Sequence, residues 1–146
     1  MKRSKWATVL IVPALIAPLA ACGGGDGGSG SAPQEKKAEQ PADLKGTWKS
    51  SENEGNYFQA KIESKTMTVS IVDSKQKSSS LYWAGTYTAP SKPGTHTWVS
   101  KNDTSKTGPS ILGSPDPTKE FTYKDGKISY SMTIAGTTKT VELTKE

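Results

Sequence analysis

The sequence of 146 residues contains one histidine, His96, and one cysteine, Cys22, and these two counts limit its chemistry. A Ser-His-Asp triad needs an imidazole, so it would have to be built on His96. That residue lies in the alternating run 95–99, where we expect it to pack on a strand face or to meet solvent. One imidazole and one thiol are too few for a zinc site of His and Cys ligands. We therefore expect no catalytic residue, no metal and no cofactor.

Carboxylates are the other groups that could act chemically. Glu52, Glu54 and Asp43 gather around the segment 51–56, which is similar to an oxygen-ligand loop but lacks the ligand spacing of a calcium-binding hand. We interpret the segment as a solvated turn between the first two strands. Glycoside hydrolysis would need two carboxylates at a defined separation, which the sequence alone does not give.

The N-terminus has the organisation of a secretory signal. Lys2, Arg3 and Lys5 precede a short apolar region at 6–18. The apolar stretch 6–21 has 16 residues, two of them proline, whereas a membrane-spanning helix needs about 20 apolar residues. An ordinary secretory cleavage site would give no reason for a cysteine at its end.

The signal ends in Leu19-Ala20-Ala21-Cys22, which resembles the lipobox of bacterial lipoproteins. This resemblance implies cleavage before Cys22 and a diacylglycerol on its thiol. It also implies that the protein is held by lipid on the outer face of the cell membrane, since two or more acyl chains give durable attachment. Segment 1–21 is thus predicted to be a signal peptide.

Charge argues against nucleic acid as a partner. Lys2, Arg3 and Lys5 leave with the signal, which lowers the net charge from +5 to +2 and removes the only arginine. Lysine lacks the planar fork that favours paired contacts to phosphate and guanine. No second cysteine is present to form an intrachain disulfide.

Segment 22–42 is predicted to be a flexible linker, and 43–146 a single folded domain. The linker has Gly, Ser, Pro, Gln, Glu and Lys but no large apolar residue, so it cannot bury enough area to offset the entropy of ordering. The remaining 104 residues suit one small domain, which we expect to be monomeric.

The domain is predicted to be all-β. Apolar residues alternate with Ser and Thr in 66–71 and in 127–134, as in an antiparallel sheet with one solvated face. Comparable runs give about eight short strands in an up-and-down meander that forms a barrel or a sandwich. The upstream strands are expected at 46–50, 57–62, 66–72, 81–88 and 95–100.

Two turns predict the register of the last three strands. Asp125-Gly126 is a strong hairpin signal that pairs Tyr123 with Ile128 and Phe121 with Tyr130. A next turn at Gly136-Thr137 would pair Met132 with Val141 and Tyr130 with Leu143. Both turns place apolar side chains on one surface.

Gly46-Thr47-Trp48 at the first strand resembles the Gly-x-Trp signature of lipocalin-like and avidin-like barrels. The short length implies an interior filled by side chains. The chain also resembles small lipoproteins of Gram-positive actinobacteria and their prophages, a likeness that concerns location and fold more than mechanism. It is carried by the stretches LKGTWKS at 44–50, LYWAGTY at 81–87, WVSKND at 98–103 and FTYKDG at 121–126.

Two features are candidates for recognition. Tyr82 and Trp83 are adjacent on a strand, so at least one should lie outside the core or in a second packed layer, and Trp98 is a further candidate. Segment 101–118 has no strand pattern, and loops of this length are often functional. Ile111 and Leu112 within it suggest that part of the segment packs down.

These observations favour a non-enzymatic binding module, tethered by lipid, with a protein or wall glycan as partner. The prophage likeness implies one specific form, which is an altered host envelope that excludes a second phage. An inhibitor of lysozyme is an alternative, because Tyr82-Trp83 is similar to strands of lipid-anchored inhibitors, although those carry a disulfide. The Gly-x-Trp likeness leaves a carrier of a small apolar ligand as a third possibility.

Overall fold

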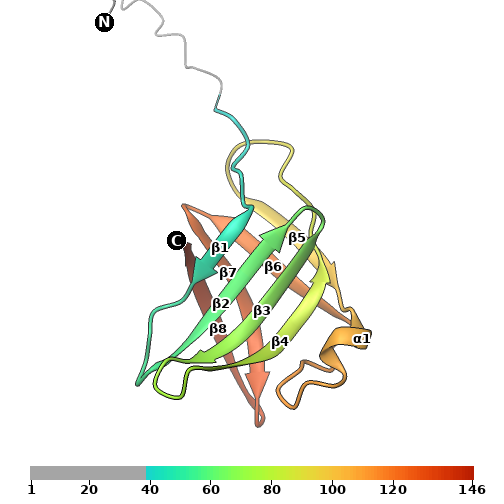
Figure 1. Ribbon diagram of the computed structural model, residues 1–146. Helices are drawn as coiled ribbons and strands as arrows, with labels where there is room; N and C mark the ends of the chain where they lie inside the picture. Colours follow the sequence, from blue (N-terminus) through green and yellow to red (C-terminus); the bar gives the residue numbers. More distant parts are fainter. Residues whose placement is uncertain (1–38) are drawn as a thin grey trace, which may run out of the picture. The chain divides into compact units, whose positions relative to one another are not determined.

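A computed structural model of the protein describes residues 39–146. The predicted signal 1–21, Cys22 and most of the predicted linker lie outside these residues. Eight antiparallel strands curl into a nearly closed barrel (Figure 1). The elements are β1 (Gly46–Lys49), β2 (Asn56–Glu63), β3 (Thr66–Asp73), β4 (Ser78–Thr86), β5 (His96–Lys101), α1 (Thr104–Thr107), β6 (Thr118–Lys124), β7 (Lys127–Ile134) and β8 (Thr137–Lys145).

The strands follow one another around the wall in the order β4-β3-β2-β1-β8-β7-β6-β5. Each ladder is antiparallel, and β1 joins the first four strands to the last four by pairing with both β2 and β8. The predicted all-β, up-and-down architecture is therefore confirmed, and of the two predicted forms the chain adopts the barrel.

Hairpin register is confirmed at one turn and corrected at the next. Tyr123 pairs with Ile128 and Phe121 with Tyr130, as Asp125-Gly126 predicted. The prediction for the next hairpin is wrong by two residues, because Met132 pairs with Lys139 and Tyr130 with Val141. The turn lies at Ala135-Gly136, where φ is 49° and 79°, the backbone that a tight two-residue hairpin requires. A shift of two keeps the same side chains inside.

The barrel interior is filled by large side chains. Trp48 is almost fully buried, and its indole Nε1 donates to the carbonyl of Leu44 at 2.8 Å. Complete burial of each large apolar side chain stabilises the fold by roughly 1.5–3 kcal/mol. The largest side chains that are essentially inaccessible are Trp48, Trp83, Phe121, Leu44, Ile62, Met67, Ile128, Leu143 and Val69.

A β-bulge corrects the expectation for Tyr82 and Trp83. Val69 pairs with Trp83, and the next residue, Ser70, pairs with Leu81, so Tyr82 is an extra residue on β4. Because the bulge interrupts the alternation of faces, both Tyr82 and Trp83 point into the core, at 3% and 0% exposure. Neither lies on the surface.

No continuous ladder of backbone hydrogen bonds joins β4 to β5. At this seam the two strands are held together instead by hydrogen bonds that involve side chains. The indole Nε1 of Trp83 donates to Ser100 Oγ at 2.9 Å, and the amide of Lys101 donates to Thr86 Oγ1 at 2.9 Å. Gly85 forms a single bridge with Asn102. A Cβ on Gly85 would lie 2.5 Å from the Lys101 carbonyl oxygen, so the close approach needs glycine.

Segment 102–117 covers the edge of β4 that has no neighbouring strand among the described residues. It contacts the residues of β4 that come just before Gly85 in the sequence. The amide of Asp103 donates to the Ala84 carbonyl at 2.8 Å, the amide of Ser114 to the Tyr82 carbonyl at 2.8 Å, and Ser110 Oγ to the Leu81 carbonyl. The segment therefore protects a sheet edge. Part of the segment packs down, as predicted, but through Thr107 and Ser114 at 3% and 5% exposure; Ile111 and Leu112, which suggested the packing, are 99% and 44% exposed.

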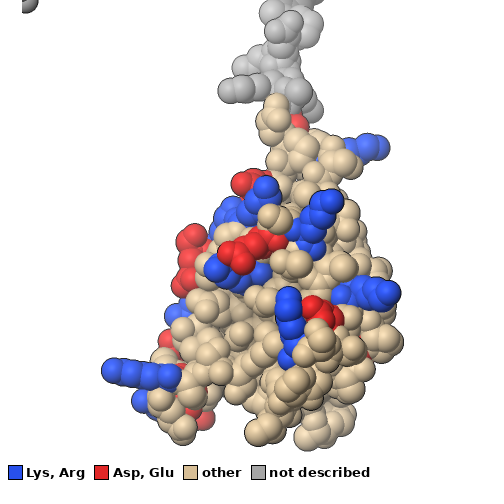
Figure 2. Space-filling model, turned by 45° about the vertical axis from the view of Figure 1, so that its right-hand side comes forward, with Lys and Arg blue, Asp and Glu red and all other residues tan. Residues whose placement is uncertain are grey.

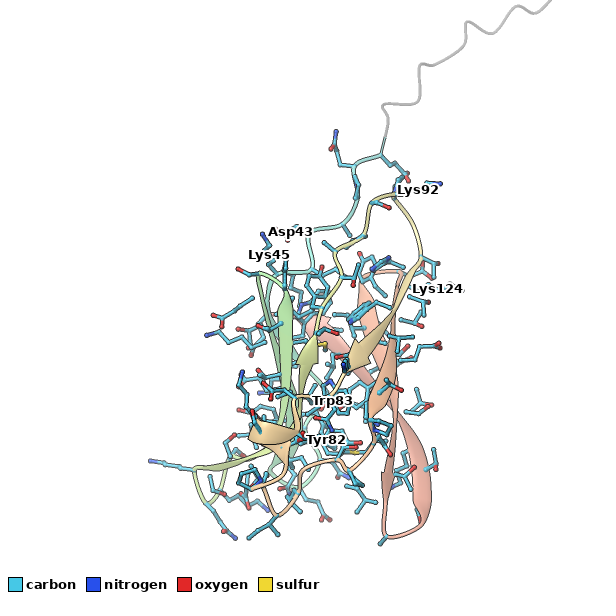
Figure 3. All side chains as sticks on the ribbon, turned by 90° about the vertical axis from the view of Figure 1, so that its right-hand side faces the viewer. Asp43, Lys45, Tyr82, Trp83, Lys92 and Lys124 are labelled. Carbon is cyan, nitrogen blue, oxygen red and sulfur yellow. The ribbon has the colours of Figure 1, made fainter. Side chains whose placement is uncertain are left out.

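The two ends of the barrel differ. Residues 39–45 enter beside the β4–β5 and β6–β7 connections, where Figure 3 shows Asp43, Lys45, Lys92 and Lys124. The opposite end, called here the far end, carries the β7–β8 turn and the loop between α1 and β6 (Figure 1). Over residues 39–146, no helix has the length and apolar character needed to cross a membrane.

We expect Gly85→Ala to destabilise the barrel by about 1–3 kcal/mol, because overpacking forces backbone to move. The added methyl group would meet Ser100 Oγ and the Lys101 carbonyl and would separate β4 from β5. Urea unfolding followed by tryptophan fluorescence measures the change. Ser79→Ala, at an exposed position of β4, is the control. Equal stability of Gly85→Ala and the wild type would contradict this account of the seam.

Candidate functional site

The aromatic residues predicted for recognition lie in the core. Figure 3 places Tyr82 and Trp83 between the walls of the barrel, beside α1. Tyr82 stacks near Tyr130 with 6.3 Å between ring centroids, and Trp98 stacks on Phe121 at 5.5 Å. Trp98 is 4% exposed. Tyr82, Trp83 and Trp98 are therefore packing residues, and the prediction that they form a surface is corrected.

Little aromatic surface remains for a sugar to stack upon. Among the described residues, Tyr57, Phe58 and Tyr123 are the aromatic side chains of Tyr, Phe or Trp that are only partly buried. The ammonium of Lys49 covers the Tyr57 ring at 3.9 Å from its centroid. Tyr123 meets Trp48 edge-on at 6.1 Å. Exposed indoles, which suit glycan recognition best, are missing from residues 39–146.

Exposed large aliphatic side chains gather at the far end. Of the four in the described residues, Ile111, Leu112 and Ile134 belong to the far-end loop and the β7–β8 turn, and Val99 lies on the outer wall of β5. In Figure 2 the lower right of the visible face, where this loop lies, is largely free of charged side chains. Uncharged, aliphatic loop tips are suited to protein contact.

An apolar cleft opens between β2 and β8, and we name it the β2–β8 cleft. It arises because β1 ends at Lys49, while β2 and β8 each extend past it toward the far end. The cleft has a volume of about 370 Å³. Its lining is formed by Phe58, Met132, Ile134, Thr137, Lys139 and Val141.

Lys119 is a cation inside the barrel wall. Its side chain is 7% exposed, and its ammonium donates to Asp116 Oδ2 at 2.9 Å and to the Ser131 carbonyl at 3.2 Å. It also lies 5.5 Å from the ring centroids of Tyr82 and Trp83. Hydrogen bonds from Lys119 and then Ser114 hold the pKa of the Asp116 carboxyl below its usual value. The contacts satisfy the buried charge, so Lys119 has a structural role.

His96 and Tyr130 also occupy packed positions. The His96 ring stacks on Trp98 at 5.5 Å, and its Nε2 is 2.8 Å from the Thr88 carbonyl oxygen. This agrees with the expectation that His96 packs on a strand face. Burial, and then the neighbouring Tyr82, raises the pKa of the Tyr130 hydroxyl, which has no hydrogen-bond partner within residues 39–146.

The acidic segment 51–56 forms a turn, as predicted. Glu52 accepts a hydrogen bond from Ser74 Oγ at 2.9 Å and lies 3.8 Å from the Lys49 ammonium. Glu54 has a positive φ of 54° and is exposed. In the described part of the chain, no three His, Cys, Asp or Glu side chains lie close enough to hold a metal ion.

Comparisons with protein families, with curated proteins and with solved structures find no match to this chain.

Sequence reasoning missed the cleft and the buried cation. Lys119 shares a strand face with Phe121 and Tyr123, and this alternation was a usable signal for an inward lysine. Ile134 ends an alternating run immediately before a turn, where an apolar side chain passes beyond the packed core. Because β1 has only four residues, Phe58 is half-buried and Lys139 is exposed. The ends of strands are the feature that sequence patterns predict least well.

We expect Asp116→Asn to lower the free energy of unfolding by about 1–3 kcal/mol, because it leaves a buried ammonium without its carboxylate. Half-exposure of Asp116 favours the lower part of this range. The double variant Asp116→Asn/Lys119→Met should recover part of the loss, since no unpaired charge remains. Urea titrations of the wild type, Asp116→Asn, Lys119→Met and the double variant measure the coupling.

The same pair gives a pH dependence. A carboxyl whose pKa is lowered by folding stabilises the native state above its ordinary pKa of about 3.9, and this contribution disappears as pH falls through the lower folded value. The deficit of Asp116→Asn should therefore be full at pH 6 and shrink below about pH 4. A deficit that stays constant down to pH 2 would contradict the assigned ion pair.

Proposed function

We propose that this protein is a non-enzymatic binding module that recognises a protein through the far end of its barrel. The observation that carries the proposal is the exposure of Ile111, Leu112 and Ile134 at that end, at 99%, 44% and 49%. Apolar loop tips held by a rigid scaffold are a common arrangement for recognition. Segment 102–117 is anchored to β4 by three hydrogen bonds, so its tip is presented by an ordered frame.

The other candidate functions have less support. A wall glycan would need aromatic platforms, and the indoles are buried. A carrier would need an internal cavity, and the interior is occupied by Trp48, Trp83, Phe121 and their neighbours. The likeness to lysozyme inhibitors depended on Tyr82-Trp83, both of which are inside the core. Protein recognition is the function that agrees best with the exposed aliphatic side chains at the far end.

The proposal includes a location on the outer face of the cell membrane. It is supported by Leu19-Ala20-Ala21-Cys22 after an apolar signal, and by the linker composition. The linker composition predicts a reach of roughly 25 Å root-mean-square for about twenty residues, which would allow the module to act away from the lipid surface. Exclusion of a second phage, implied by the likeness to prophage lipoproteins, is one setting for such recognition.

We expect Ile111→Ser/Leu112→Ser to reduce crosslinking of the full chain to envelope proteins of the producing cells by at least about fivefold, since two buried aliphatic contacts are worth about 1 kcal/mol or more. Both residues are exposed, so stability should not change. Val99→Ser removes an exposed apolar side chain from the outer wall of β5 and is the matched control. Crosslinking that is equal in all three proteins would contradict the proposal.

We expect Cys22→Ser to abolish lipid attachment. In producing cells fed an alkyne fatty acid, the wild-type chain should take up the label and remain with the membrane, because two or more acyl chains hold it durably. The variant should carry no label and should leave the membrane fraction. Label retained by Cys22→Ser, or absent from the wild type, would overturn the assigned anchor.

A further inference from the structure

The barrel wall is interrupted in three places, and in two of them the chain makes specific hydrogen bonds across or beside the gap. Segment 102–117 covers β4 beside the β4–β5 seam. β6 and β7 pair over 121–124 and 127–130 but separate toward the far end. There the ammonium of Lys119 donates to the Ser131 carbonyl across the gap. The third interruption lies beyond the end of β1, where Phe58, Met132 and Val141 give the β2–β8 cleft an apolar lining.

Free backbone groups of β8 face this third interruption. The amide of Glu146 donates to the Thr47 carbonyl of the β1 side at 3.0 Å. Because successive residues of a strand direct their amides to opposite sides, those of Thr138, Thr140 and Glu142 also point toward β1 and away from β7. β1 pairs only with Thr144 and Lys145. Within residues 39–146 these three amides and carbonyls therefore have no backbone partner.

Side chains beside this edge have a definite chemistry. Lys139 and Val141 of β8 line the cleft together with Phe58 and Met132, so apolar surface lies next to a row of free hydrogen-bonding groups. Lys139 has no carboxylate partner among the described residues, whereas the outward Glu142 is already paired with Lys127 at 2.9 Å. The site combines a strand edge, an apolar hollow and one free cation.

We propose that the free edge of β8 binds an extended segment of a partner protein, which adds a strand over the β2–β8 cleft. The segment would donate and accept hydrogen bonds at Thr138, Thr140 and Glu142. Apolar residues at alternate positions would enter the cleft, and an acidic residue would pair with Lys139. This inference rests on the proposed recognition function and names the class of ligand.

Two other occupants fit less well. The linker 22–42 of the same chain has no large apolar residue to fill the cleft. In a second copy, antiparallel pairing of two β8 edges would set Lys139 opposite itself, or opposite Val141 or Leu143, because only inward residues share that face. None of these side chains neutralises the ammonium. An inward lysine at an edge is a known protection against such self-pairing.

The test uses the full chain in lipid nanodiscs and a displayed library of random nine-residue peptides. We expect enriched peptides to alternate apolar residues with polar ones and to contain Asp or Glu. Thr140→Pro removes one outward amide and no bond to β7, so it should weaken the best peptide by about tenfold. Thr140→Val retains the amide and is the matched control. Lys139→Glu should exchange the preference for an acidic residue for a basic one.

Hydrogen exchange of the amides at 138, 140 and 142 should slow when peptide is bound, and circular dichroism checks that each variant folds. If no alternating peptide is enriched, or if Thr140→Pro and the wild type bind equally, the inference is overturned. Displacement of peptide by oleate with unchanged binding to Thr140→Pro would assign the cleft to an aliphatic ligand and also overturn it. Dimers lost in Thr140→Pro would instead assign the edge to a second copy.

Failure here is distinguishable from failure of the proposed function. Crosslinking that depends on Ile111 and Leu112, together with no peptide on β8, leaves the recognition function in place and removes only the strand addition. If peptide binds β8 but crosslinking does not depend on Ile111 and Leu112, the strand addition is kept and the proposed role of the loop tip is removed. Recognition would then be assigned to the cleft.

Discussion

Closure of the wall between β4 and β5 is the constraint on which the rest of the structure depends. An up-and-down sheet removes its edges only by closing, yet here the first and last strands of the sheet do not form a ladder. The hydrogen bond from Trp83 to Ser100 and the absence of a side chain at Gly85 bring the strands together. Segment 102–117 then satisfies the β4 carbonyls that closure leaves free. The sequence suggested a functional loop here, but most of segment 102–117 serves to cover the edge of β4.

The same closure decides which residues remain for recognition. Because the seam directs Trp83 inward, and a bulge brings Tyr82 with it, aromatic rings fill the interior in the described residues. The proposed recognition therefore relies on groups outside the core, namely the aliphatic tip at Ile111 and Leu112 and the hollow beyond the end of β1. In this proposal the barrel is a rigid support for its edges and loop tips.

Alternation of apolar and polar residues predicted the all-β meander, and the Asp125-Gly126 turn predicted the register of the β6–β7 hairpin. Alternation failed at β4, because a bulge inserts one residue and lets two adjacent aromatic side chains share a face. It also missed the turn after β7 by one residue, since Ala135 accepts a positive φ that sequence preference assigns to glycine. The cleft depends on where β1 stops, which is set by tertiary pairing rather than by local preference.

The length of β1 links the fold to its function. If β1 were as long as its neighbours, β2 and β8 would be joined to the far end, and the half-buried Phe58 would be covered completely. That barrel would have more hydrogen bonds and a larger protected core. The chain instead follows Lys49 with a turn that bonds to Ser74 beside β3 and leaves β8 uncovered. Specific hydrogen bonds bridge the two other interruptions, whereas no backbone group within residues 39–146 pairs with this stretch of β8. Such an edge has the features of a site at which a partner protein adds a strand to the sheet.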